Sequence, residues 1–452
     1  MHRKLSYRGG MTRLPGTVNR PAGSVSVVLP PSTESEVDGM DGASSVNTGW
    51  READRGMSSG RPVARESAPP RTPLAAASVP APPRVSRESA PNQATLAAWN
   101  ELVRHTEGTD VTQLSVWATI RALAGYTPTY LFAYRGNTLV AGALLLRRRL
   151  LGFLSIGYLP YGPVIHPEAP DRPAVIAAMV EELNAFAGHQ GLLFIQPPEH
   201  AHDVSEALLA RGYRPSKAGV APAGSYRLDL TPPLEEIRAG FSKRLKSWTN
   251  RWESKGVRVR HGDERDLPLL LSLMARTGER QGFRPPPLAY VQTLYRELGQ
   301  LGNAALFVGE VNGVPVSADV VTVCGGMVRG RLGGFNGDGE TGKLSVPAAV
   351  RWEIIKWAKE RGYHYLDFGG LPERMLTDMI DRGIHTSDEW PSAQRSKLQF
   401  NGAPFRYPMP VELVRPPVLR LAYDWGTSHP SGMRVVQTVK ELLRASARPT
   451  RS

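Results

Sequence analysis

Apolar side chains recur at helical spacing between Ser345 and Gly362, and this is the clearest local pattern in the chain. Val350, Ile354 and Trp357 fall on one face at intervals of three and four residues, opposite charged residues. Serine is a typical N-cap residue, and glycine tolerates the left-handed conformation that often ends a helix. The pattern therefore predicts an amphipathic helix from Ser345 to Gly362.

The pattern changes to that of a strand directly after this helix. Residues 363–368 are rich in aromatic and aliphatic side chains that favour strands, and Gly369-Gly370 follows them. Two adjacent glycines commonly mark a turn. We expect a helix, a tight turn, a buried strand and a glycine turn in succession.

A similar order of elements occurs earlier in the chain. Residues 112–146 read as a helix and then two strands joined at Gly136-Asn137, and a second hairpin turns at Asn312-Gly313. Leu131-Phe132 matches Leu306-Phe307, and the glycine before each later strand recurs at a similar offset. These repeats predict two copies of one α/β unit rather than a solenoid.

The duplication suggests a division of the chain into three parts. Residues 1–95 are rich in Pro, Ser, Gly, Ala and Arg, show no periodicity and are expected to be disordered. Residues 96–234 form the first predicted domain, which residues 405–452 complete. Residues 235–404 form the second predicted domain, and the fold class is α/β (α+β).

Composition narrows the possible compartments and partners. The chain has 452 residues, a formal net charge of +13 and one cysteine. A lone cysteine excludes an intramolecular disulfide and a cysteine-based zinc cluster, so we expect a cytoplasmic protein. The positive charge favours an anionic partner such as nucleic acid, a phosphorylated substrate or anionic lipid. No apolar stretch in the sequence is long enough for a transmembrane helix.

Two local patterns invite a nucleotide or nucleic-acid interpretation. Residues 237–260 combine many basic residues with Trp248 and Trp252, which suits phosphate contact as well as simple packing. Residues 337–344, GDGETGKL, approach a P-loop, but Leu344 stands where that motif needs a Ser or Thr to hold magnesium. We expect a flexible turn there. The histidines show no metal-binding spacing.

Six short motifs, in the same order, resemble those of the Fem (FemABX) peptidyltransferases. They cover about residues 97–410. In order, they are Gln113 with Trp117; Tyr158, Pro160, Gly162 and Pro163; Thr277 with Arg280; the following Tyr290; Gly362 to Gly370 with Asp367 and Phe368; and Ser396 to Asn401 with Lys397. The resemblance implies tandem GNAT-like acyltransferase domains.

The resemblance also implies a reaction and its residues. Fem proteins transfer an amino acid from aminoacyl-tRNA to an amine of a peptidoglycan precursor during formation of the cell-wall bridge. Lys397 would then stabilise the tetrahedral oxyanion. Arg121 would meet an anionic group of the acceptor, Tyr290 would hydrogen-bond it, and Phe335 would lie beside it. No metal or cofactor is expected, because aminoacyl-tRNA is the co-substrate.

Departures from the family motifs keep other acceptors and reactions open. Leu123, Pro286 and Ser396 replace the amide, Arg and Phe of the family pattern, which suits a small-molecule amine as acceptor. An acyl-CoA N-acetyltransferase and a non-enzymatic RNA-binding module are further alternatives. A lipid-linked acceptor would bring the protein to the inner face of the membrane, where basic residues assist peripheral contact.

Overall fold

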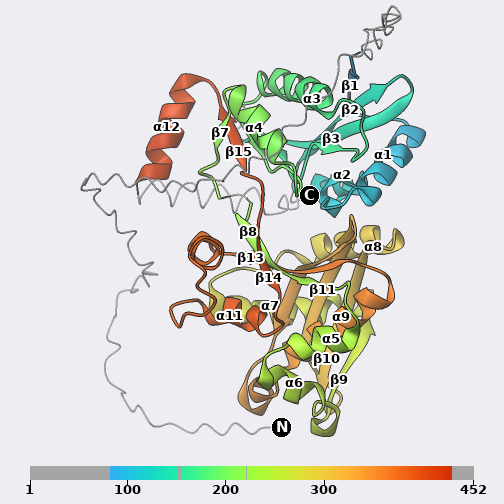
Figure 1. The fold of residues 1–452 in the computed structure, drawn as a ribbon, viewed down its shortest axis with the longest axis vertical. Coiled ribbons are helices and arrows are strands. Elements are labelled where there is room, and N and C mark those ends of the chain that lie inside the picture. Colours follow the sequence, from blue (N-terminus) through green and yellow to red (C-terminus); the bar gives the residue numbers. More distant parts are fainter. Residues whose placement is uncertain (1–81, 151–153, 220, 430–452) are drawn as a thin grey trace, which may run out of the picture. The chain divides into compact units, whose positions relative to one another are not determined.

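Two β-sheets, each with helices on both faces, form the core of the protein (Figure 1). The computed structural model describes residues 82–150, 154–219 and 221–429. The first sheet has the order β1 (Arg84–Glu88), β2 (Thr127–Arg135), β3 (Thr138–Leu150), β4 (Leu154–Leu159), β6 (Leu192–Ile195), β15 (Val411–Val414) and β7 (Arg214–Pro215), and β5 (Val164–Ile165) pairs with β3. The second has the order β14 (Ala403–Arg406), β8 (Gly224–Asp229), β13 (Tyr365–Leu371), β12 (Met327–Phe335), β11 (Val314–Cys324), β10 (Ala304–Val311) and β9 (Val257–Gly262).

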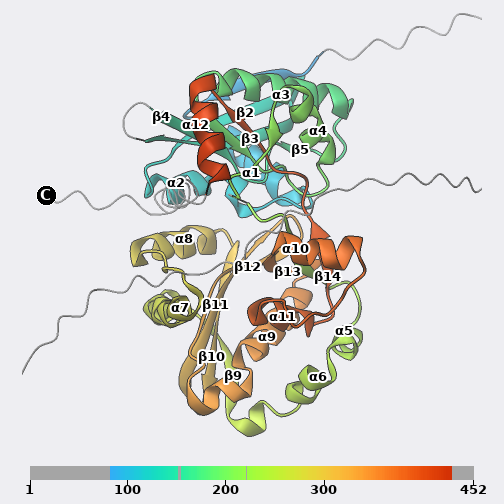
Figure 2. The same ribbon diagram turned by 90° about the vertical axis from the view of Figure 1, so that its left-hand side faces the viewer.

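Helices cover both faces of each sheet. The first sheet lies between α1 (Gln93–His105) with α2 (Val116–Ala122) and α3 (Arg172–Ala187) with α4 (His202–Ala210). Figure 2 shows α7 (Leu267–Gln281) and α8 (Leu288–Gln300) on one face of the second sheet and α9 (Val346–Glu360) on the other. The remaining described α-helices are α5 (Leu234–Gly240), α6 (Lys243–Thr249), α10 (Glu373–Leu376), α11 (Ser392–Leu398) and α12 (Pro417–Ser428).

One hydrophobic cluster joins the two sheets. It contains Trp99 and Trp117 from α1 and α2 together with Leu270 and Leu294 from α7 and α8. Burial of each large apolar side chain stabilises the folded state by about 1.5–3 kcal/mol. The two halves of the molecule therefore share part of their core.

The predicted duplication and the tandem GNAT-like fold are confirmed. Strands β2, β3, β4 and β6 pair in the same manner as β10, β11, β12 and β13: two antiparallel pairings and then one parallel pairing. The hairpins also share a bulge, which falls after Ala133 in β2 and after Gly309 in β10. Because the bulge lies in the same place relative to the turn in both hairpins, the two units descend from one ancestral unit.

The bulges correct the predicted register of the repeat by one residue. Leu131 pairs with Ala143, whereas its counterpart Phe307 pairs with Asp319. Leu131 packs on the side of α3, and Phe307 packs on the side of α9 against Trp357. Matching Leu131 to Leu306, as the letters suggest, would place corresponding side chains on opposite faces of the two sheets.

The helix predicted from Ser345 to Gly362 is present as α9, with differences at its ends. Ser345 takes a left-handed conformation, with φ +56°, and makes no side-chain cap hydrogen bond. Gly362 is left-handed, with φ +74°, as predicted. Gly369-Gly370 does not end the strand: both residues lie inside β13, where the register with β8 shifts. A bulge replaces the predicted turn.

The predicted disorder of residues 1–95 is wrong for its last part. Arg84–Glu88 forms the edge strand β1, which pairs antiparallel with β2, and Val85 packs against the cluster under α3. Backbone hydrogen bonds to β2 and one partly buried valine order this polar segment. Residues 1–81 of the predicted tail lie outside the described residues.

Other differences concern elements that the apolar pattern hides. The basic segment 237–260 forms α5, α6, a short 3-10 turn and β9. Strand β12, which contains three glycines and two arginines, was not predicted. The described residues belong to one compact unit, Ala77–Ser452, so the boundaries at 234 and 404 stay a prediction. Strand β15 lies in the first sheet, whereas β8 lies in the second.

Candidate active site

A cavity opens where β12 and β13 diverge in the second sheet. The two strands pair in parallel from Met327 to Arg329 and then separate, while β13 continues along β8. The cavity of about 200 Å³ lies between them, with Gly330 and Gly333 of β12 on its wall and Arg351 of α9 opposite. The glycines leave bare backbone facing the space, so a small group can approach the strand closely.

Lys397 lies next to this cavity and is buried. Its ammonium donates hydrogen bonds to the carbonyls of Gly369 at 3.1 Å and Gly370 at 2.9 Å. Burial and the nearby Arg351 lower the pKa of Lys397 to about 8, while Asp367 opposes the shift. The ammonium is therefore mostly charged at neutral pH, and it uses two of its three N–H donors on the bulge of β13.

Four charged residues line the cavity itself: Arg331 and Asp367 belong to the buried ion cluster described below, and Asp319 and Arg351 do not. Burial raises the pKa of Asp319 to about 6, although Arg351 opposes the shift. Arg351 donates a long hydrogen bond of 3.4 Å to the hydroxyl of Ser396 and lies 6.0 Å from the ring centre of Phe368. Sequence reasoning missed both residues. A carboxylate inside the apolar run VPVSADVVTV was the available indication for Asp319.

The structure brings Arg121 and Tyr290 together. The Arg121 guanidinium lies 6.0 Å from the ring centre of Tyr290 and 4.6 Å from that of Tyr126. Arg331 of β12 lies over Trp117, which is one helical turn before Arg121 on α2. These contacts place the predicted acceptor residues beside the strand that lines the cavity.

Phe335 ends β12 and is held by α7. Its N–H donates to the hydroxyl of Thr277 at 3.0 Å, and its carbonyl accepts from Arg280 at 2.6 Å. Gln113 also has a positioning role: it is fully buried, and its side-chain amide donates to the carbonyl of Pro160 at 2.5 Å. Two pairs of motif residues that are distant in sequence are thus joined by hydrogen bonds.

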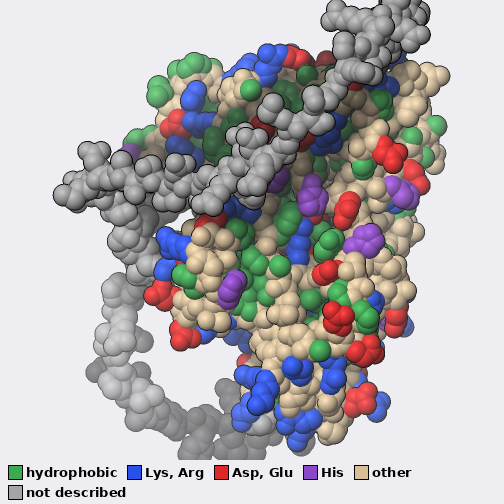
Figure 3. All heavy atoms as spheres, in the orientation of Figure 1, with side chains coloured by type: hydrophobic (Ala, Val, Ile, Leu, Met, Phe, Trp, Pro, Cys, Tyr) green, Lys and Arg blue, Asp and Glu red, His purple; other side chains and the backbone are tan. Residues whose placement is uncertain are grey.

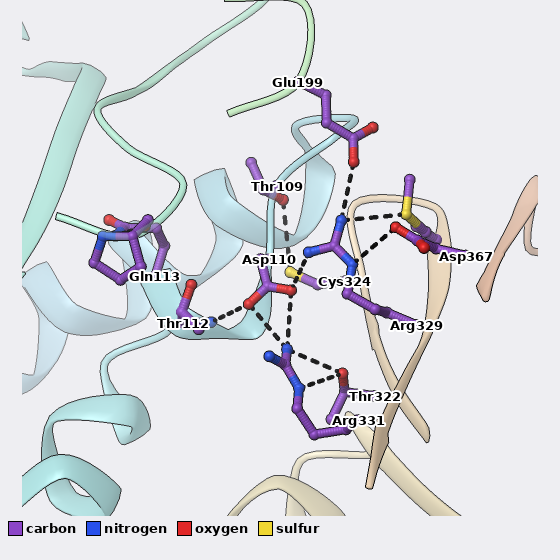
Figure 4. Close-up of polar contacts among 12 residues, drawn as sticks. Thr109, Asp110, Thr112, Gln113, Glu199, Thr322, Cys324, Arg329, Arg331 and Asp367 are labelled. Carbon is purple, nitrogen blue, oxygen red and sulfur yellow. Dashed lines mark hydrogen bonds and ion pairs between the residues drawn. The ribbon is translucent and has the colours of Figure 1, made fainter. Parts of the chain in front are cut away.

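A buried ion cluster connects the two halves (Figure 4). Arg329 of β12 donates to Asp110 at 2.5 Å, to Glu199 at 2.9 Å and to Asp367 at 3.3 Å. Asp110 lies between Arg329 and Arg331, which also donates to it at 2.9 Å. Burial raises the pKa of Asp110, but Arg331 and Arg329 together hold this pKa well below its usual range.

The cluster continues toward β14. Arg227 forms an ion pair with Glu199, and the hydroxyl of Tyr407 donates to Asp367 at 2.8 Å. Burial raises the pKa of Glu199 to about 7 against the effect of Arg227 and Arg329. Each of the three buried carboxylates has an arginine partner, which buried charges require to be stable.

Comparisons with known proteins support the fold and the motifs. A family model described as an acetyltransferase (GNAT) domain matches residues 239–382. The lipid II:glycine glycyltransferase of Staphylococcus haemolyticus is 26% identical over 229 residues, which are 48% of this chain and 54% of the relative. The UDP-N-acetylmuramoylpentapeptide-lysine N(6)-alanyltransferase of Weissella viridescens is 24% identical over 295 residues, 62% of this chain and 86% of the relative.

A solved structure gives the same result for the fold. The crystal structure of FemX superposes with a TM-score of 0.62 at 16% identity and covers 75% of this chain and 99% of that chain. The chain is thus similar in sequence to a glycyltransferase and an alanyltransferase of this kind, and similar in fold to FemX. The resemblance predicted from six motifs is therefore confirmed. The chain spans about half the length of the glycyltransferases that it matches.

The described residues contain neither a candidate membrane-spanning helix nor a candidate metal cluster. Among them, no helix has the length and apolar character needed to cross a membrane. Within the same residues, no group of three or more His, Cys, Asp or Glu side chains is placed to hold a metal ion. The roles of Lys397, Arg121, Tyr290 and Phe335 stay predictions.

Proposed function

We propose that this protein transfers an amino acid from aminoacyl-tRNA to an amine of a lipid-linked peptidoglycan precursor. The observation that carries the proposal is the buried ammonium of Lys397 beside a small cavity at the divergence of β12 and β13. The names of the relatives, a glycyltransferase and an alanyltransferase, indicate the kind of group transferred.

The reaction exchanges an ester for an amide. The acceptor nitrogen attacks the ester carbonyl carbon of the donor, and the carbonyl oxygen becomes an oxyanion. The bond between that carbon and the ribose oxygen then breaks, and a proton passes from the nitrogen to the ribose oxygen. Because the ester is already activated, the protein mainly has to orient the reactants and stabilise the oxyanion.

Lys397 supplies that stabilisation. Its third N–H remains for the oxyanion after Gly369 and Gly370 accept the other two. Backbone carbonyls fix the position of the cation before the substrates bind, so little reorganisation is needed during the reaction. On the acceptor side, Arg121 and Tyr290 bind an anionic group and a polar group of the precursor.

The basic surface at the far end of the second sheet contributes to RNA binding. In Figure 3, Lys and Arg side chains gather over α6 and β9, and the exposed members are Lys243, Arg244, Arg251, Lys255, Arg258 and Arg260. Trp252 of the same segment is buried and donates to the carbonyl of Leu344, so it acts in packing. Basic residues also assist contact with the membrane surface that carries the acceptor.

The test is a transfer assay with the purified full chain. tRNA charged with labelled glycine or alanine is mixed with lipid II or with its soluble UDP-linked precursor, and amide product is separated from ester by its stability to mild base. We expect product that disappears after RNase treatment. A comparable rate with acetyl-CoA would instead support an acetyltransferase, and transfer only to small-molecule amines would change the acceptor.

A further inference from the structure

The carboxylate of Asp319 is partly buried and differs from the fully buried carboxylates of the ion cluster. Asp110, Glu199 and Asp367 each accept hydrogen bonds from arginine. Within the part of the chain that the structure describes, the carboxylate of Asp319 has no hydrogen bond and no ion pair. An ionised carboxylate that leaves water without a partner is unfavourable. Its position in the middle of β11 therefore calls for a ligand.

The surroundings of Asp319 form a small cavity rather than a packed core. Asp319 pairs with Gly333 of β12, and a Cβ at Gly333 would lie only 2.1 Å from its Oδ1. A Cβ at Gly330 would have no neighbour closer than Asp367 O at 3.8 Å, so this part of the wall has room for a side chain. Glycines at these two positions keep the space in front of the carboxylate empty.

Charges of opposite sign lie around the cavity. Asp319 is negative, whereas Arg351, which also lines the cavity, and the nearby Lys397 are positive. The other two charged residues of the lining, Asp367 and Arg331, are paired with Arg329 and Asp110. Phe368 lines the cavity and precedes Gly369, whose carbonyl accepts from Lys397. An aminoacyl ester has matching ends, because it carries an α-ammonium group and a carbonyl that becomes negative during transfer.

We propose that this cavity receives the aminoacyl group of the donor and that Asp319 binds its α-ammonium group. The proposal rests on the proposed function. A volume of about 200 Å³ is below the ~300–1,000 Å³ typical of sites for drug-sized ligands, which selects a small amino acid. Asp319 is then a donor-binding residue that holds the carbonyl of the ester near Lys397.

The first test compares two donors that differ only in the ammonium group. Alanyl-tRNA carries it, and lactyl-tRNA has a hydroxyl in its place. The wild-type protein should prefer the alanyl donor in kcat/KM by roughly 10- to 100-fold, the size expected of a charge-assisted hydrogen bond. Asp319→Asn should reduce this preference to within about threefold by slowing only the alanyl donor.

A control and an alternative role sharpen this test. Asp229→Asn changes another carboxylate of the second sheet, one that is exposed and bound to Thr231, and should keep the wild-type preference. If Asp319→Asn slows both donors equally, Asp319 acts on the acceptor as a base or only supports the fold, and the proposal is overturned. An unchanged melting temperature excludes the second of these explanations.

The second test does not depend on turnover. A non-hydrolysable donor, 3′-alanylamino-3′-deoxyadenosine, is titrated into the full chain by calorimetry alongside its N-acetylated form. Asp319→Asn should weaken binding of the free amine at least tenfold and leave the acetylated analogue unchanged. If the wild type binds both analogues equally or neither, the proposal fails. Binding without transfer to any acceptor would overturn the proposed function alone.

Discussion

The two parallel strand pairs of the duplicated fold differ in what lies between and beside them. In the first half, β4 and β6 pair from Ile156 to Leu159, and Gly157 is close-packed against Leu193. In the second half, β12 and β13 separate after Arg329, and a Cβ at Gly330 would meet its nearest neighbour only at 3.8 Å. The first pair is closed by side chains at Gly157, whereas the second pair opens onto a cavity at Gly330.

The same difference appears one strand further along the sheet. Ala143 of β3 is fully buried in the cluster under α3. Its counterpart Asp319 occupies the same place in the bulged hairpin of the second half and lines the cavity. Duplication allows one copy to keep the structural role while the other accepts charged residues that cost stability. The chemistry is therefore expected in the second half.

The largest expected effect concerns the junction between the halves. Arg329→Met removes the cation that three buried carboxylates share. The cluster then holds three carboxylates but only two arginines, Arg331 and Arg227, and one uncompensated buried charge costs about 3–5 kcal/mol of unfolding free energy. Chemical denaturation of the variant should show this loss. A variant as stable as the wild type would mean that the junction does not depend on the ion cluster.

Lys397→Met should give the next largest effect. Its proposed partner exists only during the reaction, so kcat should fall by roughly 10²-fold while the KM of the acceptor stays within a few fold. Lys359→Met is the matched control, because Lys359 also donates to two backbone carbonyls, of Leu230 and Thr231. Full turnover of a folded Lys397→Met variant would remove this residue from the site.

Valine substitutions at Gly330 and at Gly157 should have different effects, one on donor use and the other on stability. Gly330→Val adds a side chain on the cavity wall, where its Cβ makes only an ordinary contact of 3.8 Å, so the melting temperature should stay the same while kcat/KM for the donor falls about tenfold. Gly157→Val meets Leu193 at 2.8 Å and Phe186 at 3.1 Å, so overpacking should cost ~1–3 kcal/mol. The reverse pattern in calorimetry and initial rates would contradict the assignment of the cavity.

Removal of residues 1–90 should have the smallest effect. This effect should be a loss of stability in the first half. It deletes β1 and the ion pair of Arg87 with Glu182, which lies at 2.9 Å. We expect the melting temperature to fall by about 2–4 °C, as for a loss of ~1 kcal/mol, with unchanged turnover. An unchanged melting temperature would show that the edge strand adds no stability.

Periodicity in the sequence was sufficient to predict α9, the helix before the first hairpin, both hairpins and the duplication, because these elements have one apolar face. It did not predict β12, since glycine and arginine disfavour the strand pattern and are present for the cavity and the ion cluster. Resemblance supplied Lys397, Arg121, Tyr290 and Phe335. Asp319 and Arg351 required the structure, because only the pairing of β11 with β12 and the packing of α9 place them across one cavity.

The most direct test of the difference between the halves is hydrogen–deuterium exchange with and without the non-hydrolysable donor analogue. The account predicts slower amide exchange in β12 and in Tyr365–Leu371 of β13 when the analogue is bound, because the ligand suppresses local opening. Exchange in β4 and in Leu192–Ile195 of β6 should stay the same. Protection confined to β4 and β6, or none at β12 and β13 under saturating analogue, would contradict it.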